Sequence, residues 1–442
     1  MLSLGIRCAR VILSTAGIVL ATSLQGVPVF AQGTSVRDSQ PPPLTTMPER
    51  TNWSYFCDAA HKTEYDAALK CIKLTHSGKL TVSVGGEIRE RGEYSDHPTW
   101  GQDPPDNGYS LQRYALYEDI HAGSRVRLFS ELDSALEYGR DGGPRAVIDR
   151  DKLFVHQTFL DLDLWKSGDN YLRLRSGRQE LSFGADRLVS IREGPNVLQN
   201  FDGFRLTLAD RGWKTDLLAT KYSESNPGIF DDSPTHSYSF WGLYTTHPFF
   251  SVKDTKIDLY YLGTDKKLAK FAQGNAREQR ETVGSRLAGK HQNFDYDTEG
   301  TFQFGRFGSG DIRAWAIATN SGYTVSPSSS SVKMRFAFEG GVASGDHNLH
   351  DHTLGTFNAL FPKGAYFNEA ELLGPYNIIH LRPNVKFELR HNITIWPDAS
   401  FFWRQSTSDA IYRVPEILQR ASGASRARYI GSQANIELDW HP

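Results

Sequence analysis

Charged side chains that recur at alternate positions are the residues of this sequence that could bind a ligand. The stretch SRVRLFSELDSAL carries Arg125, Arg127, Glu131 and Asp133 on one side of an alternating pattern. An arginine stays charged and can hold a carboxylate through two parallel hydrogen bonds, and opposed charges across a narrow, watery space attract polar solutes. The predicted set facing such a space is Arg89, Arg91, Arg113, Arg125, Arg127, Glu131, Asp133, Asp161, Asp163, Arg173, Arg175 and Arg205.

A second interpretation of these charges stays open, because they could pair with one another and merely fill the interior. Later segments add acids and arginines to the same face, among them Asp311 and Arg313. Since both signs of charge are present, the sequence does not establish an ion preference for the whole interior.

No catalytic motif accompanies these charges. The sequence contains no G-x-S-x-G, no H-E-x-x-H and no G-x-x-x-x-G-K-[ST], which are motifs of hydrolases, zinc peptidases and nucleotide-binding loops. An enzyme that hydrolyses membrane lipid would need a serine and a histidine together on a lipid-facing surface, and the alternating pattern of residues places no such pair on one face. We therefore predict no catalytic residue and no cofactor.

The loop GDHNLHDHTLG holds His347, His350 and His352 beside Asp346 and Asp351. These side chains could bind a divalent metal, but histidine spacing on a flexible loop is a weak indication. A solvated outer loop is the favoured interpretation, so no metal site is predicted.

Alternation of apolar and polar residues predicts that strands position the charges. In KLTVSVGGEIRER, Leu80, Val82 and Ile88 lie on one face and Glu87 and Arg89 on the other, as a period of two requires. About sixteen such segments follow one another along the chain. They run for roughly ten residues, as outer-membrane strands do, whereas strands of soluble sheets average about five or six.

The charged face distinguishes a membrane barrel from a soluble sandwich. A membrane barrel turns its apolar face to lipid and its charged face to a watery lumen. The composition agrees, with 25 Phe, 19 Tyr, 9 Trp, 39 Gly and only 3 Met. We predict an all-β fold, a transmembrane antiparallel β-barrel of about 16–18 strands over residues 79–442, with a short N-terminal periplasmic segment before it.

The N-terminus predicts export. Arg7 and Arg10 precede an apolar run that ends at Leu24, and a small-residue cleavage pattern ends at Ala31. Residues 1–31 are therefore predicted to be a secretory signal peptide cut after Ala31, since an apolar run of about 14 residues is too short to cross a bilayer. The formal net charge of −2 lacks the basic excess of a nucleic-acid binder.

Residues 32–78 are predicted to be a periplasmic lead-in to the barrel. Three consecutive prolines in QPPPLTTMPER predict irregular structure. In an oxidising periplasm, Cys57 and Cys71 indicate a disulfide rather than a redox or metal site. Closing a loop of this size stabilises by about 3 kcal/mol in the chain-entropy model.

The connections between predicted strands alternate in length. Short ones such as ADRGWK and RHN contrast with long segments at 95–109, 223–236, 321–331, 345–375 and 405–425. Short periplasmic turns and longer outward loops produce this rhythm in outer-membrane barrels. A long loop such as 345–375 could also fold inward as a lid.

Two long motifs make the sequence recognisable. GRQELSFG and DRLVSIREGPNVLQNFDGFRL lie within Gly177–Leu206, and ASGDHNLHDHTLGTFNALFPKGAYF spans Ala343–Phe367. In this order they resemble the alginate export family of outer-membrane porin-like proteins. The resemblance implies a monomeric barrel of about 18 strands that conducts a polysaccharide or another polar solute. In that family an arginine-lined constriction conducts a uronic-acid polymer, a role that the arginines above fit by strand position.

Two features depart from the family pattern. About sixteen strands are predicted, and the chain ends in NIELDWHP instead of a strand closing on an aromatic residue. Either the last two strands are missing or the barrel closes with fewer; truncation is favoured, because open strand edges in lipid leave backbone groups unpaired. In addition, Arg178 and Glu180 break the alternation of YLRLR, which predicts a bulge near Gly177.

The charge pattern and the resemblance together predict a channel in the outer membrane of a Gram-negative bacterium. It would conduct polar, anionic, saccharide-like solutes or exopolysaccharide by passive passage through a charged lumen. The expected partners are outer-membrane lipid, the solute and the barrel-assembly machinery, with no nucleic acid and with the protein a monomer. Two alternatives remain, an outer-membrane enzyme acting on lipid and a secreted β-rich carbohydrate-binding protein.

Overall fold

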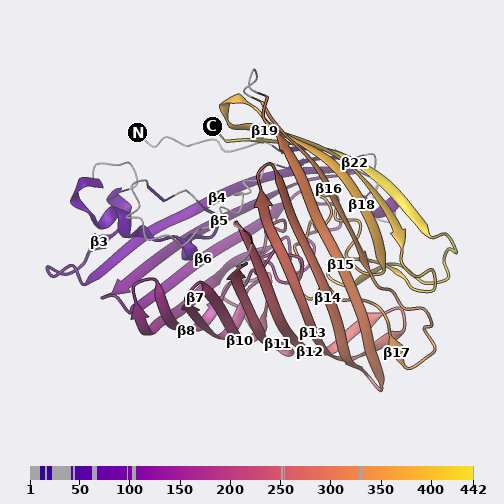
Figure 1. The fold of residues 1–442 in the computed structure, drawn as a ribbon, viewed down its shortest axis with the longest axis horizontal. Helices are drawn as coiled ribbons and strands as arrows, with labels where there is room; N and C mark the ends of the chain where they lie inside the picture. The colour runs from indigo at the N-terminus through magenta and orange to yellow at the C-terminus, as the bar shows by residue number, and fades with distance from the viewer. Residues whose placement is uncertain are drawn as a thin grey trace.

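Long antiparallel strands, each paired with the next long strand, make up the barrel (Figure 1). The computed structural model describes residues 10–14, 17–21, 41–42, 45–61, 67–96, 98–101, 106–249, 252, 254–327 and 332–441. The long strands are β4 (Leu80–Asp96), β5 (Asp106–Ala122), β6 (Val126–Tyr138), β7 (Asp151–Ser167), β8 (Asn170–Gln179), β9 (Phe201–Asp210), β10 (Trp213–Glu224), β11 (Ser233–Pro248), β12 (Thr255–Phe271), β13 (Gly274–His291), β14 (Phe294–Phe307), β15 (Gly310–Val325), β16 (Lys333–Ala343), β18 (Ile378–Glu388), β19 (Ile393–Arg404) and β22 (Tyr429–Trp440). With the two-residue strands β3 (Ile72–Lys73) and β17 (Thr353–Leu354) they form one barrel sheet of 18 strands. The predicted all-β barrel is confirmed.

A short hairpin lies at the seam between the last and the first long strand. β1 (Arg10–Ser14) pairs with β2 (Gly17–Ala21), β1 lies beside β22, and β2 lies beside β4. The hairpin belongs to the stretch predicted as a signal peptide, and the expected cleavage position at Ala31 lies outside the described residues. The hairpin forms a separate two-stranded sheet, and the barrel sheet itself is closed in the order β22, β3, β4.

The remaining elements are short. They are the 3-10 helices η1 (Pro48–Arg50), η2 (Trp53–Cys57), η3 (Ala59–His61), η4 (Ala67–Leu69) and η5 (Arg390–Asn392), the helix α1 (Pro98–Gly101), and the hairpin of β20 (Ile411–Arg413) and β21 (Ile417–Arg420). Among the described residues, no helix has the length and apolar character needed to cross a bilayer.

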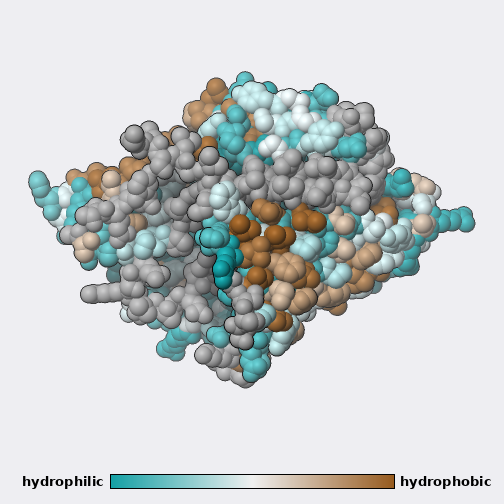
Figure 2. All heavy atoms as spheres, turned by 90° about the horizontal axis from the view of Figure 1, so that it is seen from above, coloured by the Kyte–Doolittle hydropathy of each residue, from teal (hydrophilic) through white to brown (hydrophobic). Residues whose placement is uncertain are grey.

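Side chains alternate across the barrel wall as the sequence predicts. The outward face is apolar, and Ile88, Leu116 and Phe204 are 65%, 59% and 56% exposed. The inward face carries charge, and Arg89 and Arg113 are buried. Since lipid covers the outside of such a barrel, this distribution places apolar groups in hydrocarbon and charges in the lumen. Figure 2 shows apolar residues gathered in the middle of one face of the molecule.

Three residues predicted to face the lumen lie elsewhere. Arg125 is exposed in the turn between β5 and β6, because the pairing of these strands ends before it. Asp311 and Arg313 are exposed on β15, where the buried Ile312 and Ala314 take the inward positions. Alternation fixes which residues share a face, but not where a strand stops or which of its faces is the inner one.

The irregularity predicted near Gly177 takes another form. The pairing of β8 with β7 and with β9 runs through Gly177 without an inserted residue, and the register shift in the β7–β8 pair lies between Asp163 and Trp165. Gly177 (φ +133°) faces Gly203 (φ +151°). A Cβ on Gly177 would lie 2.2 Å from the Thr158 carbonyl oxygen, so glycine is required for this close approach. The prediction of a bulge at this position is wrong.

The hydrophobic core lies inside the barrel. The loops 180–200 and 344–377 fold into the lumen and pack on its inner wall. Phe361 of the second loop contacts Phe201 of β9, with ring centroids 4.9 Å apart, and forms a backbone bridge with Val189 of the first loop. The lumen is therefore filled by its own long loops.

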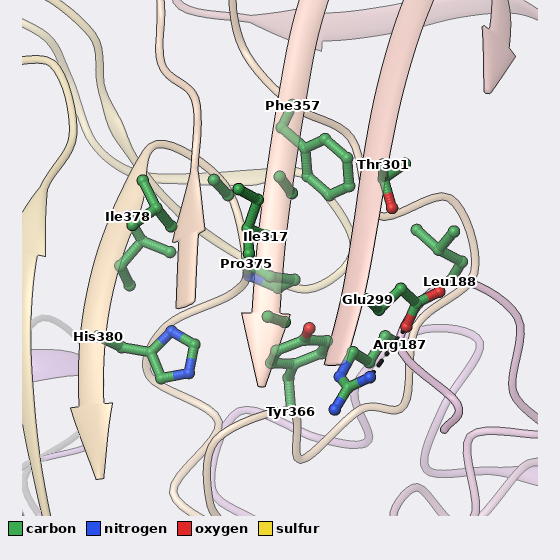
Figure 3. Close-up of a pocket in the computed structure, with 14 residues that line it drawn as sticks. Arg187, Leu188, Glu299, Thr301, Ile317, Phe357, Tyr366, Pro375, Ile378 and His380 are labelled. Carbon is green, nitrogen blue, oxygen red and sulfur yellow. Dashed lines mark hydrogen bonds and ion pairs between the residues drawn. The ribbon is translucent and has the colours of Figure 1, made fainter. Parts of the chain in front are cut away.

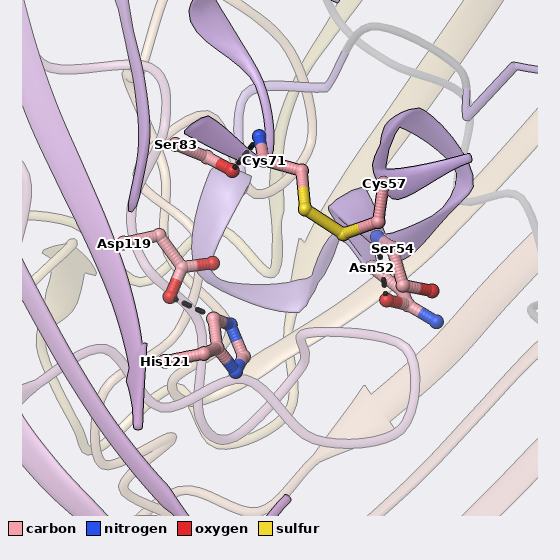
Figure 4. The surroundings of a disulfide bond; sticks show 7 residues. All are labelled: Asn52, Ser54, Cys57, Cys71, Ser83, Asp119 and His121. Atoms are coloured by element: carbon pink, nitrogen blue, oxygen red, sulfur yellow. Dashed lines mark hydrogen bonds and ion pairs between the residues drawn. A yellow bond between two sulfur atoms is a disulfide. The ribbon is translucent and has the colours of Figure 1, made fainter. Parts of the chain in front are cut away.

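The two cysteines link parts of the N-terminal segment, which we define as residues 45–61 and 67–73. A disulfide joins Cys57 at the end of η2 to Cys71 just before β3 (Figure 4). The Cys71 backbone N–H donates to Ser83 Oγ of β4 at 3.0 Å. The disulfide thereby ties η2 to the first barrel strand.

Replacing both Cys57 and Cys71 by serine is expected to loosen the N-terminal segment without unfolding the barrel. The disulfide stabilises the loop that it closes by about 3 kcal/mol in the chain-entropy model, whereas strand pairing holds the wall. Limited proteolysis of the detergent-solubilised protein should show faster cleavage within the segment, with unchanged heat-modifiable gel migration. Equal cleavage rates in the two proteins would contradict this expectation.

Candidate functional site

A row of arginine–carboxylate pairs lines the lumen across β5 to β8. Arg127 Nε donates to Asp119 Oδ1 at 2.7 Å, and Arg127 Nη1 lies 3.8 Å from Asp161 Oδ2. Asp161 also accepts two hydrogen bonds from Arg175, at 2.7 and 2.8 Å. Two-pronged pairs of this kind have a defined geometry, so the charges stand in a fixed alternating order along the wall.

The row continues around the barrel. Arg173 binds Asp163, and Arg205 binds Asp216, each through two hydrogen bonds of 2.6 to 3.1 Å. Similar pairs on the other wall are Arg286 with Asp258 and Asp297, Arg335 with Asp295, and Arg382 with Glu339 and Asp398. The inward charges thus meet partners on neighbouring strands.

The arginines of β4 hold an inserted loop. Arg89 donates to the carbonyl oxygens of Pro195 and Gly194 at 3.1 and 3.0 Å, and Arg91 donates to Gly194 at 2.7 Å. Other predicted members of the set that lie buried on this side are Arg113, Glu131 and Asp133. Apart from Arg125, the structure places the predicted set on the inward face.

Aromatic rings extend the charged row towards the N-terminal segment. Tyr117, Phe129 and Phe159 stack one after another on the inner wall, with centroids 5.8 and 5.3 Å apart. Trp53 stacks on Tyr117 at one end, and the Arg175 guanidinium lies 3.5 Å from the Phe159 ring centroid at the other. The cation–π contact joins the aromatic stack to the charged row.

The N-terminal segment covers this part of the wall. Arg127 Nη1 donates to the Glu49 carbonyl oxygen at 2.8 Å. Lys70 Nζ donates to the Tyr117 hydroxyl at 2.6 Å and lies over the Trp53 ring at 4.0 Å from its centroid. The segment therefore packs against the inner wall beside the charged row.

Buried polar contacts hold the loop 344–377 in the lumen. Arg280 of β13 is fully buried, and its guanidinium donates to Glu278 Oε1 at 2.5 Å and to the Thr356 carbonyl oxygen at 3.3 Å. Asn358 Nδ2 donates to the same Glu278 carboxylate at 3.3 Å. Removing any of these groups would leave a buried partner unsatisfied, so the loop is firmly attached.

A small cavity remains where the loops meet β14, β15 and β18 (Figure 3). Arg187 donates to Asp297 and Glu299 at 2.8 and 3.0 Å, and Figure 3 shows Tyr366 beside it, on the side towards His380. The cavity volume of about 30 Å³ admits water but not a sugar ring.

Sequence reasoning missed Arg187 and Glu193, which both lie in loop 180–200. Alternation gives no signal outside a strand, and their place within the long DRLVSIREGPN motif was the available hint. Burial raises the pKa of Glu193 to about 7, opposed by Arg113, Arg89 and a hydrogen bond with Thr46. The carboxyl group therefore changes charge near neutral pH.

The histidines of the loop 344–377 do not form a site. His347, His350 and His352 are exposed, and the described residues do not gather them around a common point.

Comparison with known proteins gives a family match over most of the chain. The sequence profile described as Alginate export matches residues 80–442, and no curated protein matches. Solved structures with a similar fold include an anion-selective porin from Comamonas acidovorans (9% identity, 81% of this chain and 98% of that chain covered, TM-score 0.43) and a BenF-like porin from Pseudomonas fluorescens Pf-5 (9%, 81% and 97%, 0.46). A third is OccAB1 from Acinetobacter baumannii (12%, 81% and 96%, 0.43).

Proposed function

Because the chain belongs to the alginate export family, as its motifs predicted, we propose that it is an outer-membrane channel through which polar, anionic saccharides pass. The observation that carries this proposal is the row of paired arginines along the lumen, from Arg127 through Arg175 to Arg205. Passage is passive, along a charged wall.

In the proposal, carboxylates of the solute replace the wall acids as partners of the arginines while the solute moves along the row. Arg173, Arg205 and Arg335 keep 29%, 16% and 22% of their side chains exposed, so a solute carboxylate can reach each guanidinium beside its wall acid. A guanidinium fork binds carboxylates well. Because the wall acid competes for the same arginine, each solute contact is weak, and conduction requires sites that release the solute.

Passage of a polymer also requires the material inside the lumen to move. The N-terminal segment and the loops 180–200 and 344–377 occupy the interior, so the form described above is the occluded one. In the proposal, these segments are displaced while the strand wall and its ion pairs stay in place.

The proposal involves no covalent chemistry, and the family match supports a channel rather than an enzyme. It acts as a monomer that contacts outer-membrane lipid and the solute and is inserted by the barrel-assembly machinery. The rival function, an outer-membrane enzyme acting on lipid, predicts phospholipid cleavage without conductance, and planar bilayers distinguish the two.

In planar bilayers, the purified protein is expected to conduct with a preference for anions, and oligouronate should block the current more strongly than neutral oligosaccharide. Replacing Arg173 and Arg205 by glutamine should shift the reversal potential under a salt gradient towards cation passage, because two reachable positive charges leave the lumen. Arg211→Gln is the matched control, since that side chain is 89% exposed in a turn. An unchanged reversal potential in the double variant, or absence of conductance in the wild type, would contradict the proposal.

The anion preference is expected to fall as the pH rises through about 7, where the pKa of Glu193 lies. Below this pH the carboxyl group is neutral, and above it a negative charge appears beside Arg89 and Arg113. Reversal potentials measured between acidic and alkaline pH should therefore change, and Glu193→Gln should remove most of the change. If Glu193→Gln shows the same dependence of reversal potential on pH as the wild type, Glu193 does not have this role.

A further inference from the structure

Three carboxylates meet where the connection between β10 and β11 crosses the start of β7. Asp151 is the first residue of β7, and Asp231 and Asp232 end the connection. One carboxylate oxygen from each lies within 4.8 Å of the others. Backbone hydrogen bonds hold the two segments together, from Lys152 N to the Gly228 carbonyl oxygen at 3.1 Å and from Phe230 N to the Leu153 carbonyl oxygen at 2.8 Å.

Two of these carboxylates are buried, and their oxygens have too few hydrogen-bond donors around them. Asp151 is completely buried, the Asp232 side chain is 3% exposed, and no N–H or hydroxyl group in the described part of the chain donates to either oxygen of Asp151 or to Oδ2 of Asp232. The two carboxyl groups hydrogen-bond each other only when one of them carries a proton. Asp232 Oδ1 accepts from Asn226 N at 2.7 Å. Arg178 Nη1 is 3.9 Å from Asp232 Oδ2, while its other nitrogens hold Asp202 at 3.0 and 3.1 Å.

Uncompensated buried charge of this kind is costly unless a cation or a proton neutralises it. One shared arginine faces three acids, so about two negative charges remain without a partner when all three are ionised. A divalent cation would supply the missing charge.

We propose that Asp151, Asp231 and Asp232 bind a calcium ion that fastens the β10–β11 connection to the start of β7. Calcium takes oxygen ligands in flexible geometry, whereas magnesium demands a near-octahedral set at shorter distances. Asp231 lies at the exposed rim of the cluster, where the ion can enter. The site does not depend on the proposed channel function.

Gly228 lets the rim carboxylate reach the cluster. A Cβ at this position would lie 2.2 Å from Asp231 Oδ2 and 2.7 Å from its Cγ. Alanine at residue 228 would therefore displace the Asp231 side chain. No local pattern marked the site in the sequence, since Asp151 is far from the other two along the chain.

Isothermal titration calorimetry with calcium chloride tests the site on the full-length protein, purified in detergent free of lipopolysaccharide and stripped with EDTA. The wild type should bind calcium at a single site with a Kd on the order of 10⁻⁴ M, as extracellular modules do, and magnesium more weakly. Asp231→Asn should raise the Kd roughly tenfold, and Asp232→Asn should abolish binding. Asp210→Asn, an acid that is 40% exposed at the end of β9, should leave the Kd unchanged.

A second readout reports on the connection itself. Calcium should slow proteolysis between residues 225 and 232 in the wild type and in Asp210→Asn, but not in Asp231→Asn. Because Asp231 is exposed, its variant keeps the fold even if Asp232→Asn does not. Absence of binding up to millimolar calcium would overturn the proposal in favour of a proton shared by Asp151 and Asp232, and binding by Asp231→Asn as tight as in the wild type would overturn it as well.

Discussion

Deleting residues 41–71 is expected to raise the single-channel conductance several-fold. These residues include most of the N-terminal segment, which covers Tyr117 with Trp53 and Lys70 and engages Arg127 through the Glu49 carbonyl. Without them, the aromatic stack and the first part of the arginine row would face open water. Conductance in planar bilayers measures the effect at fixed salt concentration.

A matched variant separates obstruction from a general disturbance of the barrel. Trp53→Ala combined with Lys70→Ala retains the chain but removes its stacking and its hydrogen bond to Tyr117. This variant should fluctuate between the wild-type current and the larger current of the deletion. Heat-modifiable migration should be the same for all three proteins, and equal conductance in the wild type and the deletion would show that ions do not pass this segment.

Replacing Arg280 by alanine is expected to lower the free energy of unfolding by about 3–5 kcal/mol, the range for breaking a buried ion pair from one side. The fully buried guanidinium joins Glu278 to the Thr356 carbonyl. Its loss leaves the Glu278 carboxylate buried with Asn358 as a neutral donor. Urea unfolding in detergent micelles, followed by gel migration, measures the change.

The matched control is an arginine on the same strand, three residues away and on the opposite face. Arg277 of β13 pairs with Asp265 on the outer side, and its side chain is 58% exposed. Arg277→Ala should change stability little, because solvent screens an exposed pair. Arg280→Ala should also speed proteolysis of the loop 344–377 and increase current fluctuations. If both variants unfold at the same urea concentration, the loop does not depend on the Arg280 contacts.

The strand wall could be predicted from the sequence because its rule is local. Neighbouring side chains of a strand point to opposite faces, so Ile88 could be placed in lipid and Arg89 in the lumen before any fold was known. The family followed from two long motifs, and both lie where loops enter the lumen. The same local rule misplaced Arg125, because alternation contains no mark for the end of a strand.

What fills the lumen could not be predicted in this way. Glu369 meets Arg91 across 278 positions of sequence, and Phe361 meets Phe201 of β9 only after the loop 344–377 turns inward. The sign and spacing of the charges could be read from the sequence, but their ion-pair partners could not. Arg127 pairs with Asp119 and lies near Asp161 because of the register of three neighbouring strands.

The sequence by itself determined which residues share a strand face, together with the family and the pair of cysteines. The tertiary structure alone decided that the lumen is occupied by the N-terminal segment and two loops, and that buried acids meet at Asp151. The physical reason is that alternation depends on the geometry of one strand, whereas the contents of the lumen depend on contacts that exist only after strands and loops distant in the sequence have come together around it.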